Sequence, residues 1–277
     1  MTDEQKLSPR TVETDPAVLE LCDKGDANSS SQTYHDRNHM FQVRDVAVAL
    51  AAKINELTPG KIDAHTQDTI IPIAALLHDI GRGIDVDNHA SAGARWARVY
   101  LKKLGFDKDT VRKIARVIAC HRSEVVLKPR SFRAANFGDA AWAIVVMADK
   151  AVGDEDRVRP EPRKELARLR KANKMSEFGG SIHDRINYAI KSAELCVDGR
   201  GNGAADPGVI VLKFKLDKVV ATPDEVYGLY GSRFHACGKA AQYLGFVFRL
   251  EFNGERYAYD KTSNTWTKIE SISVPLS

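Results

Sequence analysis

The chain has 277 residues, a formal net charge of +4 and an apolar fraction of 43%. A chain of this size can bury one large hydrophobic core and a smaller second one. No stretch approaches the roughly 18 consecutive apolar residues of a membrane span, and no signal peptide precedes the first predicted helix, so we expect a soluble protein. The small positive charge does not indicate a dedicated nucleic-acid binder, although it suits an anionic substrate.

The four cysteines, at positions 22, 120, 196 and 237, have no C-x-x-C spacing. This pattern favours the reducing cytoplasm as the location of the protein. Cys120 directly precedes His121, but it lies off the face of its predicted helix that carries His121. We therefore interpret Cys120 as a core residue and not as a metal ligand.

Residues 1–30 are predicted to form a polar tail and a short helix from about Pro16 to Lys24. The next helix begins with H-M-F-Q-V-R-D-V-A-V-A-L-A, in which His39 comes first and the apolar positions recur with helical spacing. His35 precedes His39 by four residues in Y-H-D-R-N-H-M, which places both on one helix face. A solvated histidine at a helix start is the alternative interpretation of His35.

The central motif of the chain is A-A-L-L-H-D-I-G-R-G, residues 74–83. An apolar run, expected to be a helix over 67–80, ends on the adjacent pair His78 and Asp79, and Gly81 then stops the helix. Burying an imidazole beside a carboxylate is costly unless an ion pair or a metal ion compensates. The alternative interpretation, without a metal, is that Asp79 caps the helix and His78 is a core residue.

Three further predicted helices repeat the pattern of one polar residue at a helix end or on an apolar stripe. His89 opens the helix over 90–104, His121 ends V-R-K-I-A-R-V-I-A-C-H, and Asp149 ends the core of W-A-I-V-V-M-A-D-K. Helical bundles build metal sites from such residues, one per helix, aimed at a shared core. The pattern predicts a metal site from six side chains: His39, His78, Asp79, His89, His121 and Asp149.

Between these helices and the C-terminus the sequence predicts several other segments. The basic stretch after His121, with Lys128, Arg130, Phe132, Arg133 and Phe137, is interpreted either as a loop over the substrate or as a loop anchored in the core. A charged helix from about Pro162 to Lys174 presents a solvated face. A helix over 182–197 is expected to pack on the bundle.

The composition changes at G-R-G-N-G-A-A-D-P-G, residues 199–208, which we predict to be a linker. Residues 209–277 then predict a small α+β domain of unknown role: a strand at V-I-V-L-K-F-K-L, a helix beginning at Pro223, and a hairpin whose Asn253-Gly254 turn has the type I′ signature. T-W-T-K-I is a candidate further strand. We expect no part of this domain to contribute to the metal site.

The order His39, His78-Asp79, His89, His121, Asp149 resembles the HD-domain superfamily of metal-dependent phosphohydrolases. The resemblance covers roughly residues 31–160 and is to the six-ligand type, found in HD-GYP cyclic-dinucleotide phosphodiesterases and in symmetrical dinucleoside tetraphosphatases. The closest local matches, A-L-L-H-D-I, H-x-x-x-G-A and A-D-K, are tetraphosphatase-like. Two features depart from the pattern: Arg82 stands where Lys is usual, and G-Y-P is absent. The implied fold is mainly α, an HD-type helical bundle over 31–198 followed by the small α+β domain.

The resemblance also implies roles for the site residues. One metal would be held by His39, His78, Asp79 and Asp149, and Asp79 would bridge to a second held by His89 and His121. Two divalent transition metals are implied, with iron or manganese first and cobalt, nickel or zinc also compatible. The remaining roles fall to His35 as general acid, to Arg82 and Lys150 as catalytic and substrate-binding cations, and to Arg157 as a substrate-binding residue. Lys150 has a structural alternative, because a lysine at a helix C-terminus interacts favourably with the helix dipole.

The predicted function is hydrolysis of a phosphoester or phosphoanhydride of a nucleotide-like substrate by a metal-bridging hydroxide. A mixed-valent di-iron oxygenase of the myo-inositol oxygenase-like type is one alternative, and a nucleotide-sensing HD module is another. Dinucleoside polyphosphates, cyclic nucleotides, nucleoside monophosphates and phosphonates all stay open as substrates. The expected partner is a phosphorylated small molecule and not a membrane, and the sequence leaves a homodimer open.

Overall fold

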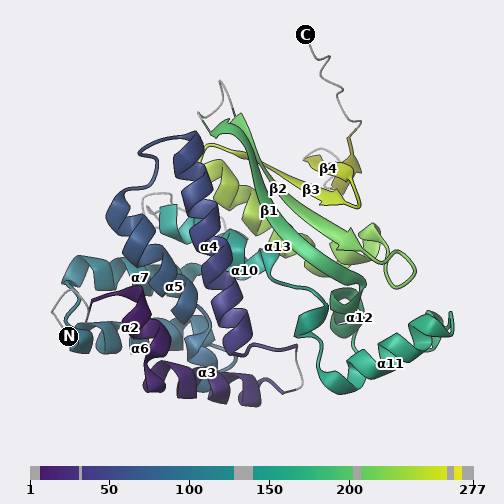
Figure 1. Ribbon diagram of the computed structural model, residues 1–277, viewed down its shortest axis with the longest axis horizontal. Helices are drawn as coiled ribbons and strands as arrows, with labels where there is room; N and C mark the ends of the chain where they lie inside the picture. The colour runs from purple at the N-terminus through teal and green to yellow at the C-terminus, as the bar shows by residue number, and fades with distance from the viewer. Residues whose placement is uncertain (1–6, 31–32, 128–139, 202–206, 261–264, 270–277) are drawn as a thin grey trace, which may run out of the picture.

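The computed structural model describes residues 7–30, 33–127, 140–201, 207–260 and 265–269. Its first two thirds are helical and its last third is a five-stranded sheet with one long helix (Figure 1). The protein is therefore mainly α with a small α+β C-terminal part, as the sequence predicts. The helical part consists, in chain order, of α2 (Pro9–Thr14), α3 (Pro16–Asn28), α4 (Arg37–Leu57), η1 (Thr66–Ile70), α5 (Ile71–Leu77), η2 (Ile80–Gly83), α6 (His89–Leu104), α7 (Lys108–Cys120), α8 (Ser123–Leu127), α10 (Ala140–Ala151), η3 (Glu155–Arg157), α11 (Pro160–Lys171), η4 (Met175–Glu177) and α12 (Ile182–Ala189).

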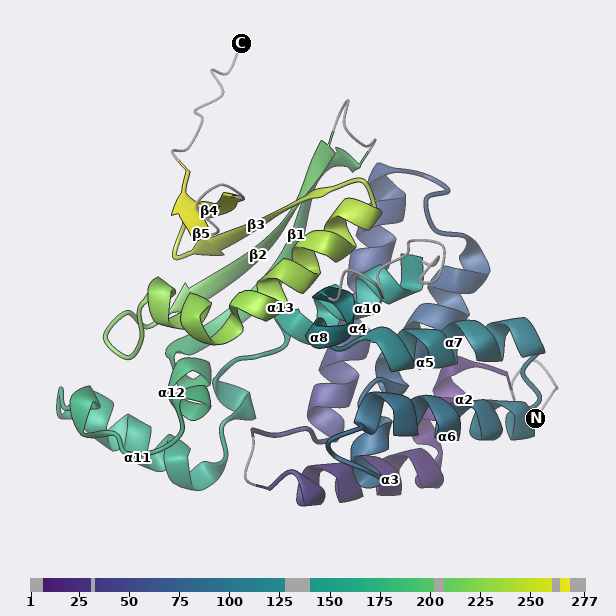
Figure 2. The same cartoon turned by 180° about the vertical axis from the view of Figure 1, so that it is seen from behind.

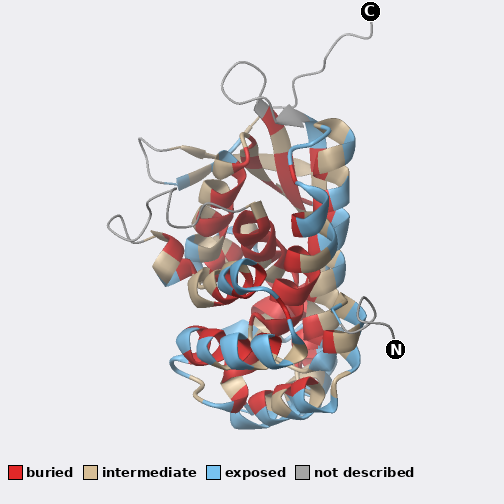
Figure 3. Ribbon diagram, turned by 90° about the vertical axis from the view of Figure 1, so that its left-hand side faces the viewer, coloured by how far each residue is buried: buried red, intermediate tan, exposed pale blue. Residues whose placement is uncertain are grey.

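Two helices, α5 and α10, form the centre of the helical part. Every residue of α5 is buried, and α10 is buried from Ala141 to Ala148. Helices that are apolar on all sides can only be stable when other elements surround them. Here α4 packs against both, and α7 also contacts both. Buried residues, shown in red in Figure 3, accordingly concentrate in the interior of the molecule.

The sheet has the order β1-β2-β3-β4-β5, formed by β1 (Ile190–Gly201), β2 (Pro207–Leu216), β3 (Val247–Phe252), β4 (Glu255–Asp260) and β5 (Thr265–Lys268). Strands β2 and β3 are parallel, and α13 (Pro223–Tyr243) connects them; all other neighbours are antiparallel. The predicted hairpin is confirmed, because Asn253 and Gly254 both have positive φ, at 52° and 87°, as a type I′ turn requires.

Helix α13 joins the sheet to the helical part. It packs against β3, and it also contacts α10 and α8 (Figure 2). Strand β1 in turn runs along α4 and contacts α10 (Figure 1). The C-terminal α+β region, by which we mean β1–β5 with α13, therefore lies directly against the helices that carry the predicted metal ligands.

The predicted helix over 182–197 is wrong in its second half. Helix α12 ends at Ala189, and Ile190 begins β1, which pairs with β2. The apolar residues Ala193, Leu195 and Val197 in fact alternate with polar ones, which is a strand period and was the missed signal. Gly201 and Pro207, inside the predicted linker, are paired across β1 and β2. The domain limits at 199–208 stay a prediction.

Other predicted elements shift by a few residues at their ends. Helix α3 extends to Asn28, and the charged helix α11 begins at Pro160. Helix α6 ends as predicted at Leu104, and its C-cap Gly105 has a φ of 102°. The basic residues and phenylalanines at 128–139 lie outside the described residues. Among the described helices, none combines the length and apolar character needed to cross a bilayer.

Candidate metal centre

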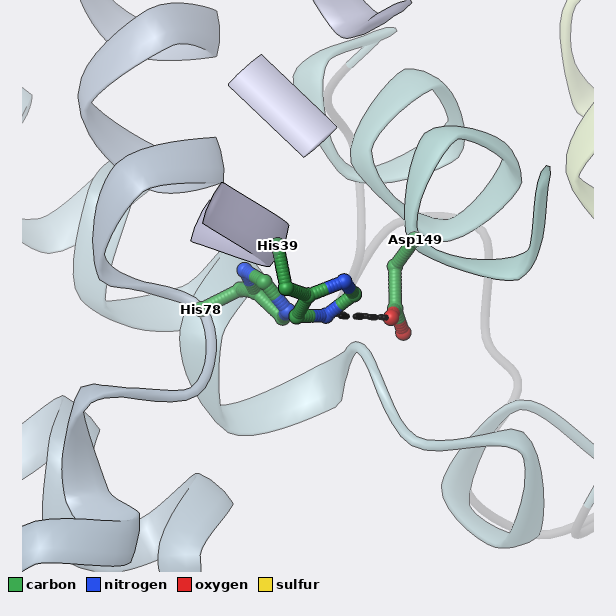
Figure 4. A group of neighbouring side chains, drawn as sticks. All are labelled: His39, His78 and Asp149. Atoms are coloured by element: carbon green, nitrogen blue, oxygen red, sulfur yellow. Dashed lines mark ion pairs between the residues drawn. The ribbon is translucent and has the colours of Figure 1, made fainter. Parts of the chain in front are cut away.

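Six histidine and aspartate side chains from five segments of the helical part meet in two adjacent groups. His39, His78 and Asp149 form one group, and Asp79, His89 and His121 form the other. Within each group the potential ligand atoms all lie within 4.8 Å of one another. The structure thus brings together all six residues that the sequence nominated as metal ligands. Figure 4 shows the first group, in which the imidazoles of His39 and His78 and the carboxylate of Asp149 point toward one another.

Each ligand stands near the end of a helix, where a short backbone segment directs it to the centre. His39 lies in the first turn of α4, whose N-cap Asp36 accepts a hydrogen bond from the His39 N–H at 3.0 Å. His89 is the first residue of α6. His78 and His121 directly follow α5 and α7, so their side chains leave the helices at the C-terminal turn.

The aspartates connect the imidazoles. Asp149 Oδ1 lies 3.8 Å from Nε2 of His39 and 3.6 Å from Nε2 of His78. Asp79 Oδ1 lies 3.3 Å from Nε2 of His89 and 3.5 Å from Nε2 of His121. Asp79 Oδ2 is also 3.7 Å from Nε2 of His78, which belongs to the first group. The Asp79 carboxylate therefore lies between the two groups.

The hydrogen bonds of the imidazoles leave their Nε2 atoms available as metal ligands. In His78, His89 and His121, Nδ1 lies 2.7, 2.8 and 2.7 Å from the carbonyl oxygen three residues earlier. A carbonyl only accepts, so each Nδ1 carries the proton and each Nε2 presents a lone pair to the centre.

Two of these imidazoles have buried nitrogen atoms without a partner. Nε2 of His78 and both ring nitrogens of His39 make no hydrogen bond among the described residues. A buried, unsatisfied polar atom costs about 1–3 kcal/mol. A divalent cation would supply the missing partner, so this donor set fits a metal ion of the kind that takes mixed imidazole and carboxylate ligation.

The electrostatic surroundings favour the ligand forms of these groups. Burial lowers the pKa of His39 and His78, and it lowers that of His89 to about 4, so these imidazoles are neutral at pH 7. Burial raises the pKa of Asp79 and of Asp149, but nearby cations, chiefly Arg82 and Lys150 respectively, outweigh it and hold both pKa values well below their usual range. Neutral imidazoles and ionised carboxylates are the forms that bind metal.

Residues 37–171 match the family model described as HD domain, and this match spans all six residues of the two groups. Residues 37–171 belong to the HD-domain family. Members of this superfamily are mostly metal-dependent phosphohydrolases, so the HD domain and its donor groups indicate a metal-dependent, hydrolase-type function. A search among curated proteins finds no match to the chain.

A glycine next to the HD pair sets the close packing of this HD domain. A Cβ atom at Gly81 would lie 2.0 Å from the carbonyl oxygen of His89 and 2.5 Å from the backbone nitrogen of Gly93. No side chain fits there, so only glycine lets η2 approach α6 this closely. The prediction that Gly81 stops the preceding helix is wrong, because α5 already ends at Leu77 and Gly81 lies within η2. Its role is the close packing that allows His89 to reach Asp79.

The predicted cations lie around the HD ligands. Arg82 Nε donates to Asp79 Oδ2 at 2.9 Å, and Lys150 forms an ion pair with Asp149. Lys150 Nζ also donates to the carbonyl oxygen of His121 at 3.3 Å. Arg157 is only 5% exposed, yet it lines a cleft together with Arg82 and Lys150.

His35 stands at the edge of the HD ligands. Its Nδ1 lies 2.7 Å from the carbonyl oxygen of Thr33, and its Nε2 lies 3.9 Å from Asp79 Oδ2. Burial, reinforced by the positive charge of Arg157, lowers the pKa of His35 well below its ordinary value. His35 is therefore partly enclosed beside the site, and the alternative of a solvated histidine does not describe it.

A cleft of about 170 Å³ opens over the HD ligands. The sequence analysis did not nominate four of the residues that line it: Arg122, Ser123, Glu124 and Arg233. The first three follow His121 directly, so adjacency to a ligand was an available signal. Arg233 comes from α13, outside the HD domain, and no local pattern in its helix indicates the site.

Proposed function

We propose that the protein is a metal-dependent phosphohydrolase that cleaves a phosphoester or phosphoanhydride bond of a nucleotide-like substrate. The observation that carries this proposal is the pair of His/Asp groups, with the Asp79 carboxylate between them, beside a cleft that Asp79, Asp149 and five cationic side chains line. Such a cleft attracts an anionic group and orients it toward the metal ligands.

We propose two divalent ions, one in each donor group, with Asp79 contacting both. The position of the Asp79 carboxylate between the groups supports this arrangement. Bound divalent ions lower the pKa of coordinated water and stabilise charge on phosphoryl oxygens. Iron and manganese suit mixed imidazole and carboxylate ligands, as do cobalt, nickel and zinc.

Arg82 and Lys150 are the cations best placed to bind the reacting phosphate. Each pairs with a ligand carboxylate, Asp79 or Asp149, so each is fixed in position beside the donor groups. Both also line the cleft. A guanidinium has five N–H donors and an ammonium has three, so both retain donors for phosphate oxygens. Donors that are fixed before the reaction stabilise charge on those oxygens most effectively.

His35 is the proposed proton donor to the leaving oxygen. Its Nε2 lies on the Asp79 side of the cleft, and its Nδ1 is held by the Thr33 carbonyl, so a proton transferred to the leaving group would have to come from Nε2. General acids typically contribute about 10²–10⁴-fold. The lowered pKa limits the protonated fraction, so we expect the contribution of His35 at neutral pH to fall at the low end.

Elemental analysis followed by a substrate screen tests the proposal. Protein reconstituted with Mn²⁺ or Fe²⁺ would be incubated with bis(p-nitrophenyl) phosphate, p-nitrophenyl phosphate, ATP, diadenosine tetraphosphate and cyclic di-GMP, with product release measured by absorbance or chromatography. We expect turnover of at least one substrate, its loss on chelation, and its return when metal is added back. Absence of turnover with any of Mn, Fe, Co, Ni or Zn would contradict the proposal.

The same set of four histidines and two aspartates also suits a di-iron oxygenase. Oxygen uptake by the reduced, iron-loaded protein, measured with a phosphonate and with myo-inositol, distinguishes this alternative. The cationic cleft favours phosphoryl transfer over oxidation of a neutral polyol. Tight nucleotide binding without turnover in all metals would instead support a sensing role.

A further inference from the structure

Helix α13 supplies one side chain to the cleft over the metal ligands. Arg233 lines this cleft together with Asp79, Asp149 and Arg157, although it lies in the C-terminal α+β region. Its guanidinium carbon lies 4.5 Å from the centre of the Tyr230 ring, which is one turn earlier on α13. Tyr230 is itself fixed, because its hydroxyl donates to Oδ1 of Asn187 at 2.7 Å. The ring of the buried Tyr230 therefore helps to position the Arg233 guanidinium.

The cations of the cleft differ in whether a carboxylate neutralises them. Arg82, Arg122 and Lys150 each form an ion pair, with Asp79, Glu124 and Asp149 respectively. For Arg157 and Arg233, by contrast, no carboxylate oxygen of the described part of the chain lies within 4.0 Å. These two guanidiniums bring positive charge to the cleft that the described residues do not pair.

Arg157 is held in this unpaired state by backbone atoms. Its Nε and Nη2 donate to the carbonyl oxygen of Tyr34 at 2.9 and 2.7 Å, and Nη1 donates to that of Val152 at 3.2 Å. A guanidinium has five N–H groups, so two remain unused by these bonds. Burial lowers the pKa of Arg157, and the positive charge of Arg233 lowers it further. The more distant carboxylates of Asp149 and Asp79 offset part of this effect on the pKa. An anion bound beside both guanidiniums would reduce their mutual repulsion further.

We propose that Arg157 and Arg233 form a binding subsite for a second phosphate group of the substrate, one that is not attacked. Guanidinium groups bind phosphate oxygens through paired N–H donors, and two of them suit a dianionic group. The substrate then carries at least two phosphate groups, and the C-terminal α+β region selects for the second. This inference rests on the proposed phosphohydrolase function, and it narrows the substrate class to diphosphates and longer polyphosphates.

Calorimetric binding of inorganic pyrophosphate and orthophosphate to the Mn²⁺-loaded protein tests the subsite without requiring turnover. We expect the wild type to bind pyrophosphate at least about tenfold more tightly than orthophosphate, since the second phosphate gains charge-assisted hydrogen bonds. Arg233→Ala should weaken pyrophosphate binding by about tenfold or more and change orthophosphate binding by less than about threefold. Metal content is measured after each titration, because pyrophosphate also chelates Mn²⁺.

Two further variants make the result specific. Arg98→Ala removes the same charge from an exposed position on α6, and both affinities should stay at the wild-type values. Arg233→Gln keeps the stem on Tyr230 and should lose the pyrophosphate preference as Arg233→Ala does, which covers the case in which the alanine variant fails to fold. The subsite is refuted if Arg233→Gln binds pyrophosphate like the wild type, or if it weakens both ligands equally.

The outcomes separate this inference from the proposed function. One outcome is that the wild type prefers pyrophosphate and Arg233→Gln does not, while the wild type turns over no phosphoester. This outcome would support the subsite and contradict the hydrolase. Turnover of a monophosphate ester that is insensitive to Arg233→Gln, with no pyrophosphate preference in the wild type, would support the hydrolase and overturn the subsite.

Discussion

Arg82 holds one oxygen of the Asp79 carboxylate, with Nε 2.9 Å from Oδ2, and thereby leaves Oδ1 turned toward the second donor group. The arginine follows the aspartate by three residues, and the turn of η2, which has Asp79 as its N-cap and contains Arg82, brings the two side chains together. This ion pair fixes the orientation of the carboxylate before any metal binds. The carboxylate that lies between the two groups is therefore held in place by a residue of its own helical turn.

Loss of either member of the HD pair should abolish both metal binding and turnover. His78→Ala removes an Nε2 ligand from one group, and Asp79→Ala removes the carboxylate that contacts both groups. We expect metal content below one tenth of the wild-type value by elemental analysis and no measurable hydrolysis. His235→Ala, in α13 and outside both groups, is the matched control and should retain metal. A fully metallated, active His78→Ala protein would refute the site.

Substitution of His35 should affect the chemical step and leave the metal in place. His35 is in neither donor group, so His35→Ala should retain wild-type metal content. We expect kcat to fall by about 100-fold on a substrate with a poor leaving group, such as an alkyl phosphate ester. The decrease should be smaller for p-nitrophenyl esters, whose leaving group needs no proton. An unchanged kcat on the alkyl ester would remove His35 as the acid.

Gly81→Ala should destabilise the protein and disturb the second donor group. The new Cβ would lie 2.0 Å from the His89 carbonyl oxygen, so η2 and α6 would have to separate. Overpacking of this kind costs about 1–3 kcal/mol or more. We expect a lower Tm and weaker metal binding, measured by thermal denaturation and metal titration.

Gly228→Ala provides the control for this substitution. Gly228 lies within α13, and a Cβ there would meet nothing within 4 Å. Replacing a helical glycine by alanine in open space stabilises by about 0.4–1 kcal/mol. The two Gly→Ala changes should therefore shift Tm in opposite directions. Equal shifts would show that close packing at Gly81 is not what matters.

Metal removal should lower the stability of the folded protein. His39 and His78 have buried ring nitrogens without partners in the described part of the chain, and a bound cation would satisfy the Nε2 atoms. A ligand that binds only the native state stabilises it by about 2.7 kcal/mol at a concentration 100 times its Kd. We expect a chelator to lower Tm by several degrees, and Mn²⁺ to restore it. The His78→Ala variant should show no such dependence on added metal.

Local sequence patterns were sufficient to predict most helices of the helical part and the positions of the metal-ligand candidates on them. His39, His78, His89, His121 and Asp149 each stand at the end of, or on, an apolar helical stripe, and such stripes are visible in the sequence. The helix over 182–197 failed because its apolar residues match a helical period up to Ile190 and a strand period afterwards. The choice between the two depended on β2, which pairs with this segment from a distant part of the chain.

The sequence by itself determined which residues have the chemistry to bind a metal and that they lie at the ends of several helices or on their apolar stripes. Only the tertiary structure decided that Asp79 groups with His89 and His121, that Gly81 permits the contact between η2 and α6, and that Arg233 of α13 reaches the cleft over the ligands. The physical reason is the distance along the sequence over which each interaction acts. Periodicity and capping act over a few residues, whereas the positions of Arg157 and Arg233 depend on how the sheet and α13 pack against the helical bundle, and no short pattern encodes that packing.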